Sequence, residues 1–124
     1  MKLSAGEWFN KADEDYTVAA RESKASPVFH NIVCYHAQQA AEKMLKAYLQ
    51  ELDIKFMKTH SLLKLLELLK TADVFMVSFQ DSFAFIDDLT PDIRYPGPGV
   101  TEADAKRALE ITEKLKAYIK DKMK

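Results

Sequence analysis

The chain has 124 residues, of which 48% are hydrophobic and 30% are charged, a composition that predicts one globular domain over residues 1–124 and excludes a disordered chain. Lysine and arginine number 18 and aspartate and glutamate 19, a net charge of −1, so the molecule as a whole has no strong field that would attract nucleic acid. The lone Cys34 cannot form an internal disulfide, and no apolar run approaches the roughly 18 residues of a membrane span, so we expect a cytoplasmic protein with no membrane partner.

Residues that break helices are concentrated in one stretch of the chain. Residues 90–99 hold three of the four prolines and two of the three glycines, and the β-branched alternation typical of strands is absent from the sequence. The rest of the chain can therefore be helical, and the sequence predicts an all-α bundle.

The first helix is expected to begin at Ser4 and to end near Lys24. Ser4 and Glu7 have the three-residue spacing of a capping box, in which the serine hydroxyl and the glutamate satisfy free backbone N–H groups. Its apolar stripe recurs at helical spacing: Trp8, Phe9, Ala12, Tyr16, Ala19 and Ala20.

The second helix is expected to start at Ser26-Pro27, because serine favours the N-cap and proline the first helical position, and to run from about Val28 to Leu52. Apolar and small side chains cover a wide part of its circumference, which predicts a central helix and a homodimer. Three polar side chains line up on one flank, at i, i+3 and i+7: His36, Gln39 and Lys43. This flank is either a binding surface or a solvated or self-associating face.

Three further helices follow. The third comes after the capping stretch Thr59-His60-Ser61, and its many leucines predict that it is mostly buried. The fourth is expected from Phe75 to about Leu89, because apolar side chains recur there at helical spacing: Phe75, Phe79, Phe83 and Ile86. The last opens at Thr101, with Asp104 in the capping-box position, and ends in lysines that suit a helix C-terminus.

The usual signatures of enzymes and metal sites are missing. The sequence has no phosphate-binding glycine loop, no paired histidines on one helical turn and no cysteine cluster. Cys34 lies on the apolar side of the second helix and is predicted to be a small core residue. The three histidines, His30, His36 and His60, show no ligand spacing, so we expect no metal and no cofactor.

The proline-rich stretch carries one candidate anion site. Arg94 and Tyr95 stand just before a rigid turn that leads into the last helix. A guanidinium, a phenol hydroxyl and free helix N–H groups all favour an anionic oxygen, so phosphate is the natural ligand. In the alternative interpretation Arg94 pairs with Asp92 or with a helix C-terminus, and Tyr95 packs over the end of the bundle.

Four short motifs together cover nearly the whole chain: residues 7–16 (EWFNKADEDY), residues 38–47 (QQAAEKMLKA), His60-Ser61-Leu62 and Arg94-Tyr95-Pro96. In this order and spacing they resemble the HEPN domain family. The resemblance implies an up-and-down bundle of four or five helices that commonly forms homodimers. Small members are often encoded beside a minimal nucleotidyltransferase, as the two halves of a toxin-antitoxin pair, and the family name records a proposed nucleotide-binding role.

The resemblance also assigns individual positions. Those that match its motifs are Gln39, Glu42, Lys43, His60, Arg94 and Tyr95. Asp15 matches an acidic position in the first helix, where its carboxylate could accept hydrogen bonds from Arg94 or Tyr95.

Many members of the family are metal-independent ribonucleases, in which an arginine is followed by a histidine after four to six residues. Counted from Arg94, that histidine would fall on Gly99, Val100 or Thr101, and no histidine follows His60. Acid–base cleavage of RNA needs a group that titrates near neutrality, whereas arginine stays protonated. The nuclease role therefore does not transfer directly, although His36 or His60 could substitute from another helix.

These observations favour a dimeric, non-enzymatic binding module. We expect it to engage a minimal nucleotidyltransferase and to accept a nucleotide or RNA phosphate. The expected binding residues are Arg94, Tyr95, Gln39, Lys43, His60 and His36. The alternatives are a metal-independent ribonuclease that uses Arg94, Tyr95 and a displaced histidine, and a purely structural helical adaptor.

Overall fold

The computed structural model describes residues 1–97 and 99–124, and within them all regular structure is helical. The elements in chain order are α1 (Leu3–Glu22), α2 (His30–Glu51), α3 (Leu62–Leu69), the 3-10 helix η1 (Val74–Phe79), α4 (Gln80–Arg94) and α5 (Glu102–Lys122). The prediction of an all-α fold is confirmed.

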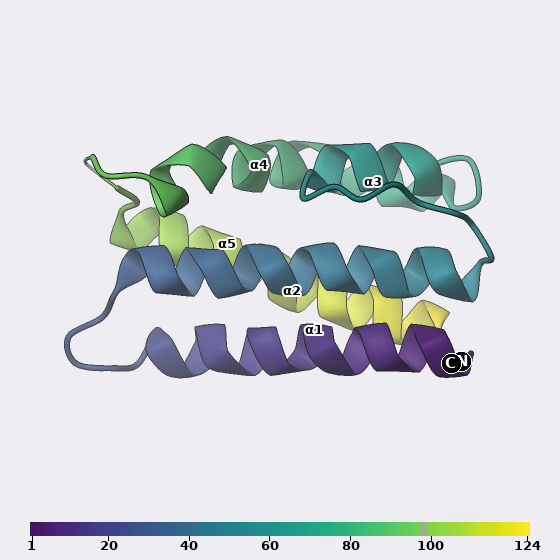
Figure 1. Ribbon diagram of the computed structural model, residues 1–124, viewed down its shortest axis with the longest axis horizontal. Coiled ribbons are helices and arrows are strands. Elements are labelled where there is room, and N and C mark those ends of the chain that lie inside the picture. The colour runs from purple at the N-terminus through teal and green to yellow at the C-terminus, as the bar shows by residue number, and fades with distance from the viewer. Residues whose placement is uncertain (98) are drawn as a thin grey trace.

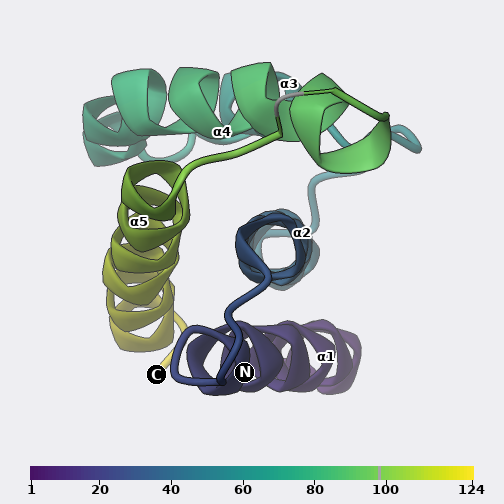
Figure 2. The ribbon, with the colours of Figure 1, turned by 90° about the vertical axis from the view of Figure 1, so that its left-hand side faces the viewer.

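Helix α2 is the centre of the bundle. Figure 2 looks down its axis and shows α1 below it, α5 on one side, and α3 and α4 in a layer above it. On the fourth side no helix of the described part of the chain lies against α2. The side chains of Ala37, Ala40, Ala41 and Ala47 are all 0% exposed, so the alanine face is already covered within one copy by close helix neighbours.

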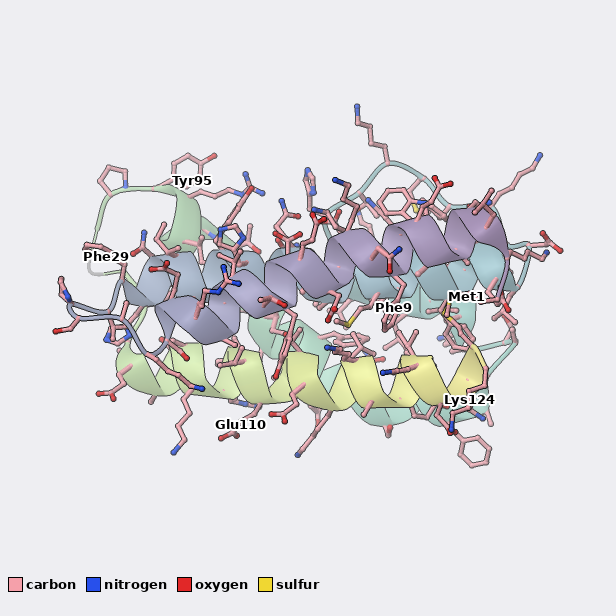
Figure 3. All side chains as sticks on the ribbon, turned by 90° about the horizontal axis from the view of Figure 1, so that it is seen from below. Met1, Phe9, Phe29, Tyr95, Glu110 and Lys124 are labelled. Carbon is pink, nitrogen blue, oxygen red and sulfur yellow. The ribbon has the colours of Figure 1, made fainter. Side chains whose placement is uncertain are left out.

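The two chain ends lie together, at the opposite end of the bundle from the 95–97 turn. Figure 1 places both termini beside the start of α1 and the end of α5. Figure 3 shows Tyr95 and Phe29 at the other end, far from Met1 and Lys124. None of the described helices is long and apolar enough to cross a membrane.

The predicted start of the first helix is wrong. Helix α1 begins at Leu3 with Lys2 as N-cap and without a side-chain cap, so Ser4 lies inside the helix. The reason is a tertiary contact: the backbone N–H of Lys2 donates to Glu51 Oε1 at 2.6 Å, which fixes the entry of the chain against the end of α2.

The predicted start of the second helix is also early. Phe29, not Ser26, is the N-cap of α2, and Pro27 lies in the connection before it. No side chain caps this end, and its first turn has no acidic residue. Its free backbone N–H groups are therefore available to a ligand or to water.

The fourth helix differs at both ends. Residues Val74–Phe79 form a 3-10 helix, whose first turn is capped by the side chain of Asp73. A 3-10 helix has about three residues per turn, so side chains at α-helical spacing do not share one face. Phe75 is therefore 71% exposed instead of buried. At the other end α4 continues through Pro91 to Arg94. The backbone N–H of Tyr95 donates to the carbonyl of Pro91 at 3.1 Å and closes this last turn.

The remaining helix starts match their predictions. Ser61 caps α3 by accepting from the backbone N–H of Lys64, and four leucines of α3 are buried. Thr101 and Asp104 form the expected capping box at the start of α5. Local capping signals are therefore enough to predict both starts.

Candidate functional site

Arg94 is the last residue of α4 and is exposed. It lines a surface hollow of about 370 Å³ together with Asn31, Ile32, Tyr35 and Ile93. No carboxylate lines this hollow, and Arg94 has no ion-pair partner in residues 1–97 and 99–124. An unpaired guanidinium beside the uncapped start of α2 is suited to an anionic ligand.

Tyr95 occupies the next hollow rather than the same one. It is 69% exposed and lines a depression of about 360 Å³ that also includes Phe29, His30 and the 96–97 turn. The two hollows share Asn31 and Ile93 in their walls. Arg94 and Tyr95 therefore lie near one another but present their side chains to adjoining surfaces.

The start of the last helix does not supply free donors as the sequence suggested. The Thr101 side chain accepts from the backbone N–H of Asp104, and Asp104 accepts from that of Thr101. Glu102 and Asp104 also place negative charge in this first turn. The uncapped helix start near Arg94 is that of α2. The free backbone N–H donors expected from the last helix are therefore supplied by the second.

Asp15 joins α1 to the polar flank of α2. Its carboxylate accepts from Lys43 Nζ at 2.6 Å and from His36 Nδ1 at 2.9 Å. The expected contact of Asp15 with Arg94 or Tyr95 is therefore wrong. Because a carboxylate only accepts, the proton of the neutral imidazole is on Nδ1, and Nε2 of His36 is left as the acceptor.

Gln39 connects this cluster to the Arg94 hollow. Its Nε2 donates to the hydroxyl of Tyr35 at 3.0 Å, and Tyr35 lines the hollow. The Tyr35 and His36 rings meet edge to face with centroids 5.2 Å apart. Gln39 and His36 thus lie on α2 beside Tyr35, whose hydroxyl-bearing side chain lines the hollow that Arg94 of α4 also lines.

His60 belongs to a separate cluster further along α2. Its Nδ1 lies 2.8 Å from Glu42 Oε1, and Lys46 Nζ donates to Glu42 Oε2 at 2.9 Å. Glu42 and Lys46 are only 4% and 7% exposed, so this pair is buried and hydrogen-bonded within the fold. The structure does not bring His60 to the Arg94 hollow, and its contacts hold the connection before α3 in place.

Cys34 has the environment of a core residue. It is 1% exposed, and burial raises the pKa of its thiol to about 12. The thiol therefore stays protonated near neutral pH and is a poor nucleophile. In the part of the chain that the structure describes, no three metal-ligating side chains of the His, Cys, Asp and Glu types gather.

Sequence reasoning missed Asn31, Tyr35 and His30 near Arg94. A signal was present, because Asn31, Tyr35, Gln39 and Lys43 recur every four residues and so form one ridge of a helix. His30 could not be assigned from spacing, since it reaches the Tyr95 hollow only through the tertiary approach of α2 to the 95–97 turn.

Comparison with known proteins gives one family. A family model described as HEPN domain matches residues 5–122. The crystal structure of an archaeal HEPN homologue is similar, with 25% sequence identity, a TM-score of 0.75 and coverage of 100% of both chains. A search of curated proteins gives no match.

Proposed function

Since the chain belongs to the HEPN domain family, we propose that it is a phosphate-binding module that accepts a nucleotide or RNA and that works as the partner of a minimal nucleotidyltransferase. The observation that carries this proposal is the exposed Arg94 with no ion-pair partner among the described residues, in a hollow without a carboxylate. Arg94 differs from an ordinary exposed cation such as Arg21 in its surroundings, because it shares a hollow with the polar side chains of Asn31 and Tyr35 beside the uncapped start of α2.

The site is assembled around the start of α2. Arg94 supplies a fork of N–H donors, Asn31 an amide, Tyr35 a phenol, and the first turn of α2 its free backbone N–H groups. These donors suit an oxyanion, and the nearby exposed ring of Tyr95 offers an apolar face for the sugar that follows the phosphate. The net charge of the chain is −1, so the molecule has no general basic surface. The attraction for phosphate must come from this local site.

Arg94→Ala tests the site directly. We expect the affinity for a short single-stranded RNA to fall by about tenfold, because a charge-assisted contact to phosphate is lost. The melting temperature should not change, since Arg94 is exposed. Arg21→Ala, an exposed arginine that lines neither hollow, is the matched control. Unchanged RNA binding with a lower melting temperature would instead support the structural adaptor.

The partnership with a nucleotidyltransferase, as a toxin-antitoxin pair, is supported by the family alone. Co-expression of the chain with the product of the neighbouring gene, followed by affinity purification and gel filtration, tests it. A stable complex of the two proteins is the expected result. If the neighbouring gene encodes no nucleotidyltransferase, or if no complex forms, the partnership is wrong.

A metal-independent ribonuclease is the second candidate, and the Asp15–His36 pair is the observation that favours it. Asp15 holds Nδ1 of His36 at 2.9 Å, which leaves Nε2 free to take the proton of a 2′-hydroxyl as a general base. Lys43 is held at the same carboxylate. Incubation of the pure protein with RNA in chelator tests this function: cleavage that His36→Ala and Arg94→Ala both abolish would establish it.

A further inference from the structure

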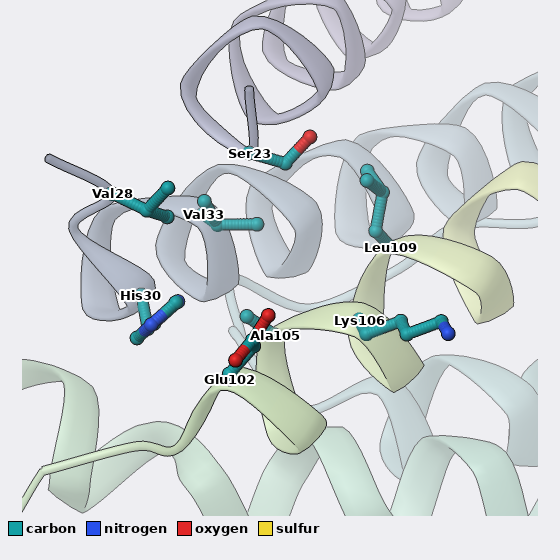
Figure 4. A pocket seen from close by; sticks show the side chains of 8 residues that line it. All are labelled: Ser23, Val28, His30, Val33, Glu102, Ala105, Lys106 and Leu109. Atoms are coloured by element: carbon teal, nitrogen blue, oxygen red, sulfur yellow. The ribbon is translucent and has the colours of Figure 1, made fainter. Parts of the chain in front are cut away.

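A cavity at the start of α5 forms a second part of the same end of the molecule. We propose that it binds the guanine base of the nucleotide whose phosphate binds at Arg94; the inference rests on the proposed function. The cavity has a volume of about 240 Å³ and lies between the end of α1, the start of α2 and the start of α5 (Figure 4). No residue of this cavity was among the predicted binding residues.

The size of the cavity favours a single ring system. Pockets that take whole drug-sized ligands usually have about 300–1,000 Å³, so 240 Å³ holds only part of a nucleotide. Its walls are largely apolar, from Val28, Val33, Ala105 and Leu109, and they come from two helices and a connection. Such walls can pack on both faces of a flat heteroaromatic ring.

Four polar side chains line the cavity, and two of them, Glu102 and Ser23, are acceptors toward a ligand. Glu102 has no hydrogen-bond or ion-pair partner for its carboxylate in the described residues, and Figure 4 shows the Lys106 side chain directed away from it. The Ser23 hydroxyl donates to the carbonyl of Ala20 at 2.6 Å, so toward a ligand it can only accept. The edge of a ligand that meets Glu102 and Ser23 must therefore present donors.

Guanine is the standard base that meets this requirement. Its Watson–Crick edge presents a ring N–H and an amino group side by side, which match the two oxygens of a carboxylate. Adenine and cytosine place an acceptor nitrogen beside their amino group, and uracil flanks its single N–H with two carbonyls. These acceptors would face the negative charge of Glu102.

His30 connects the cavity to the phosphate site. It lines both this cavity and the Tyr95 hollow, which in turn shares Asn31 and Ile93 with the Arg94 hollow. The three depressions therefore adjoin in pairs around the start of α2, and we assign them to base, sugar and phosphate in that order.

The experiment is a calorimetric titration of the full chain with four probes: 5′-GMP, 5′-IMP, 5′-AMP and ribose 5-phosphate. We expect GMP to bind about tenfold more tightly than AMP, because one bidentate contact discriminates by about this factor. IMP, which keeps the ring N–H and lacks the amino group, should fall between them. Glu102→Gln should remove the preference for GMP and leave binding of ribose 5-phosphate unchanged. Glu110→Gln, an exposed glutamate further along α5, is the matched control.

The possible outcomes separate this inference from the proposed function. If ribose 5-phosphate binds and Arg94→Ala weakens it, while GMP and AMP are equal or Glu102→Gln has no effect, the base pocket is wrong and the phosphate site stands. If none of the four probes binds the wild-type protein, both are wrong. Amide chemical shifts provide an independent readout, since GMP should perturb Val33 and Ala105 in the wild type but not in Glu102→Gln.

Discussion

Asp73 is a buried carboxylate that local sequence did not reveal. It accepts from the hydroxyls of Tyr48 and Tyr118, each at 2.7 Å, and from the backbone N–H of Phe75 at 3.2 Å. Burial alone would raise the pKa of the Asp73 carboxyl, but the hydrogen bonds from Tyr118 and Tyr48 and the nearby Lys122 outweigh it, and the pKa is lowered. The same contacts join α2, η1 and α5, which are distant in the sequence.

The raised pKa values of Tyr48 and Tyr118 predict how the free energy of unfolding changes at alkaline pH. Burial, and then the hydrogen bond to Asp73, raises the pKa of Tyr118 from 10.0 to about 12 and also raises that of Tyr48. The stabilisation is complete below the unfolded pKa of 10.0 and is lost as the pH rises through the folded values. We expect the free energy of unfolding to fall above pH 10. Urea denaturation over this range measures it, and Tyr118→Phe should reduce the slope; an equal slope in both proteins would contradict the assignment.

The pKa shift of Asp73 gives the opposite pH dependence, in which the free energy of unfolding falls toward acid pH. Because the pKa of Asp73 is lowered in the fold, its contribution is present above the ordinary pKa and is lost as the pH falls through the folded value. Asp73→Asn should therefore cost about 2 kcal/mol at neutral pH, since two tyrosine hydroxyls lose a charged acceptor. Denaturant unfolding checks this value. Asp121→Asn, an exposed carboxylate of α5 that contacts only Lys124, is the control; equal effects would show that Asp73 has no special role.

At the level of elements, Asp87 of α4 holds the start of α3. Its carboxylate accepts from the Ser61 hydroxyl at 2.8 Å and from the backbone N–H groups of Leu62 at 2.8 Å and Leu63 at 3.1 Å. Since the first turn of a helix has free N–H groups, Asp87→Ala should destabilise the protein by about 1–2 kcal/mol. Hydrogen exchange of the Leu62 and Leu63 amides should become faster. Asp88→Ala, next in the chain and exposed, should do neither.

Sequence predicted an element well where its signals are local, and poorly where a tertiary contact decides. The start of α5 follows from Thr101 and Asp104 alone. The start of α1 does not follow from Ser4, because Lys2 is held by Glu51 of another helix. Pro91 suggested a break, yet α4 continues for one more turn and so carries Arg94 at its end.

The candidate site shows the same division. Arg94 could be found from the residue types beside the turn, and it is exposed as an anion site requires. His36 and Lys43 were found by their spacing, but the carboxylate that holds them, Asp15, was assigned to the wrong partner. No pattern along one helix can show which residue of a second helix lies opposite.

For the whole molecule, the open question is the number of copies. The homodimer was expected because α2 has a wide small-residue face, but the alanines of that face are buried within one copy. Large apolar side chains do remain exposed in several other places. They are Phe29, Ile32 and Tyr95 at the end that holds the candidate site, Val74, Phe75 and Val77 on η1, and Met1, Leu3, Leu52 and Met57. A dimer must therefore use one of these surfaces.

We predict a homodimer that pairs through the surface around Ile32. This residue lies on α2, the helix with an open side (Figure 2), and the exposed Phe29 and Tyr95 at the same end are of the aromatic type enriched in protein interfaces. Arg94, which lines the same hollow as Ile32, must then lie at the rim of the interface, where a phosphate still reaches it. Light scattering at micromolar concentration should report twice the mass of one chain, and Ile32→Asp should halve it, because a charge is then placed in an apolar contact. Phe75→Asp, which changes η1 in the same way, should leave the mass unchanged. A monomeric wild type would refute the dimer, and a monomer produced by Phe75→Asp alone would move the interface to η1.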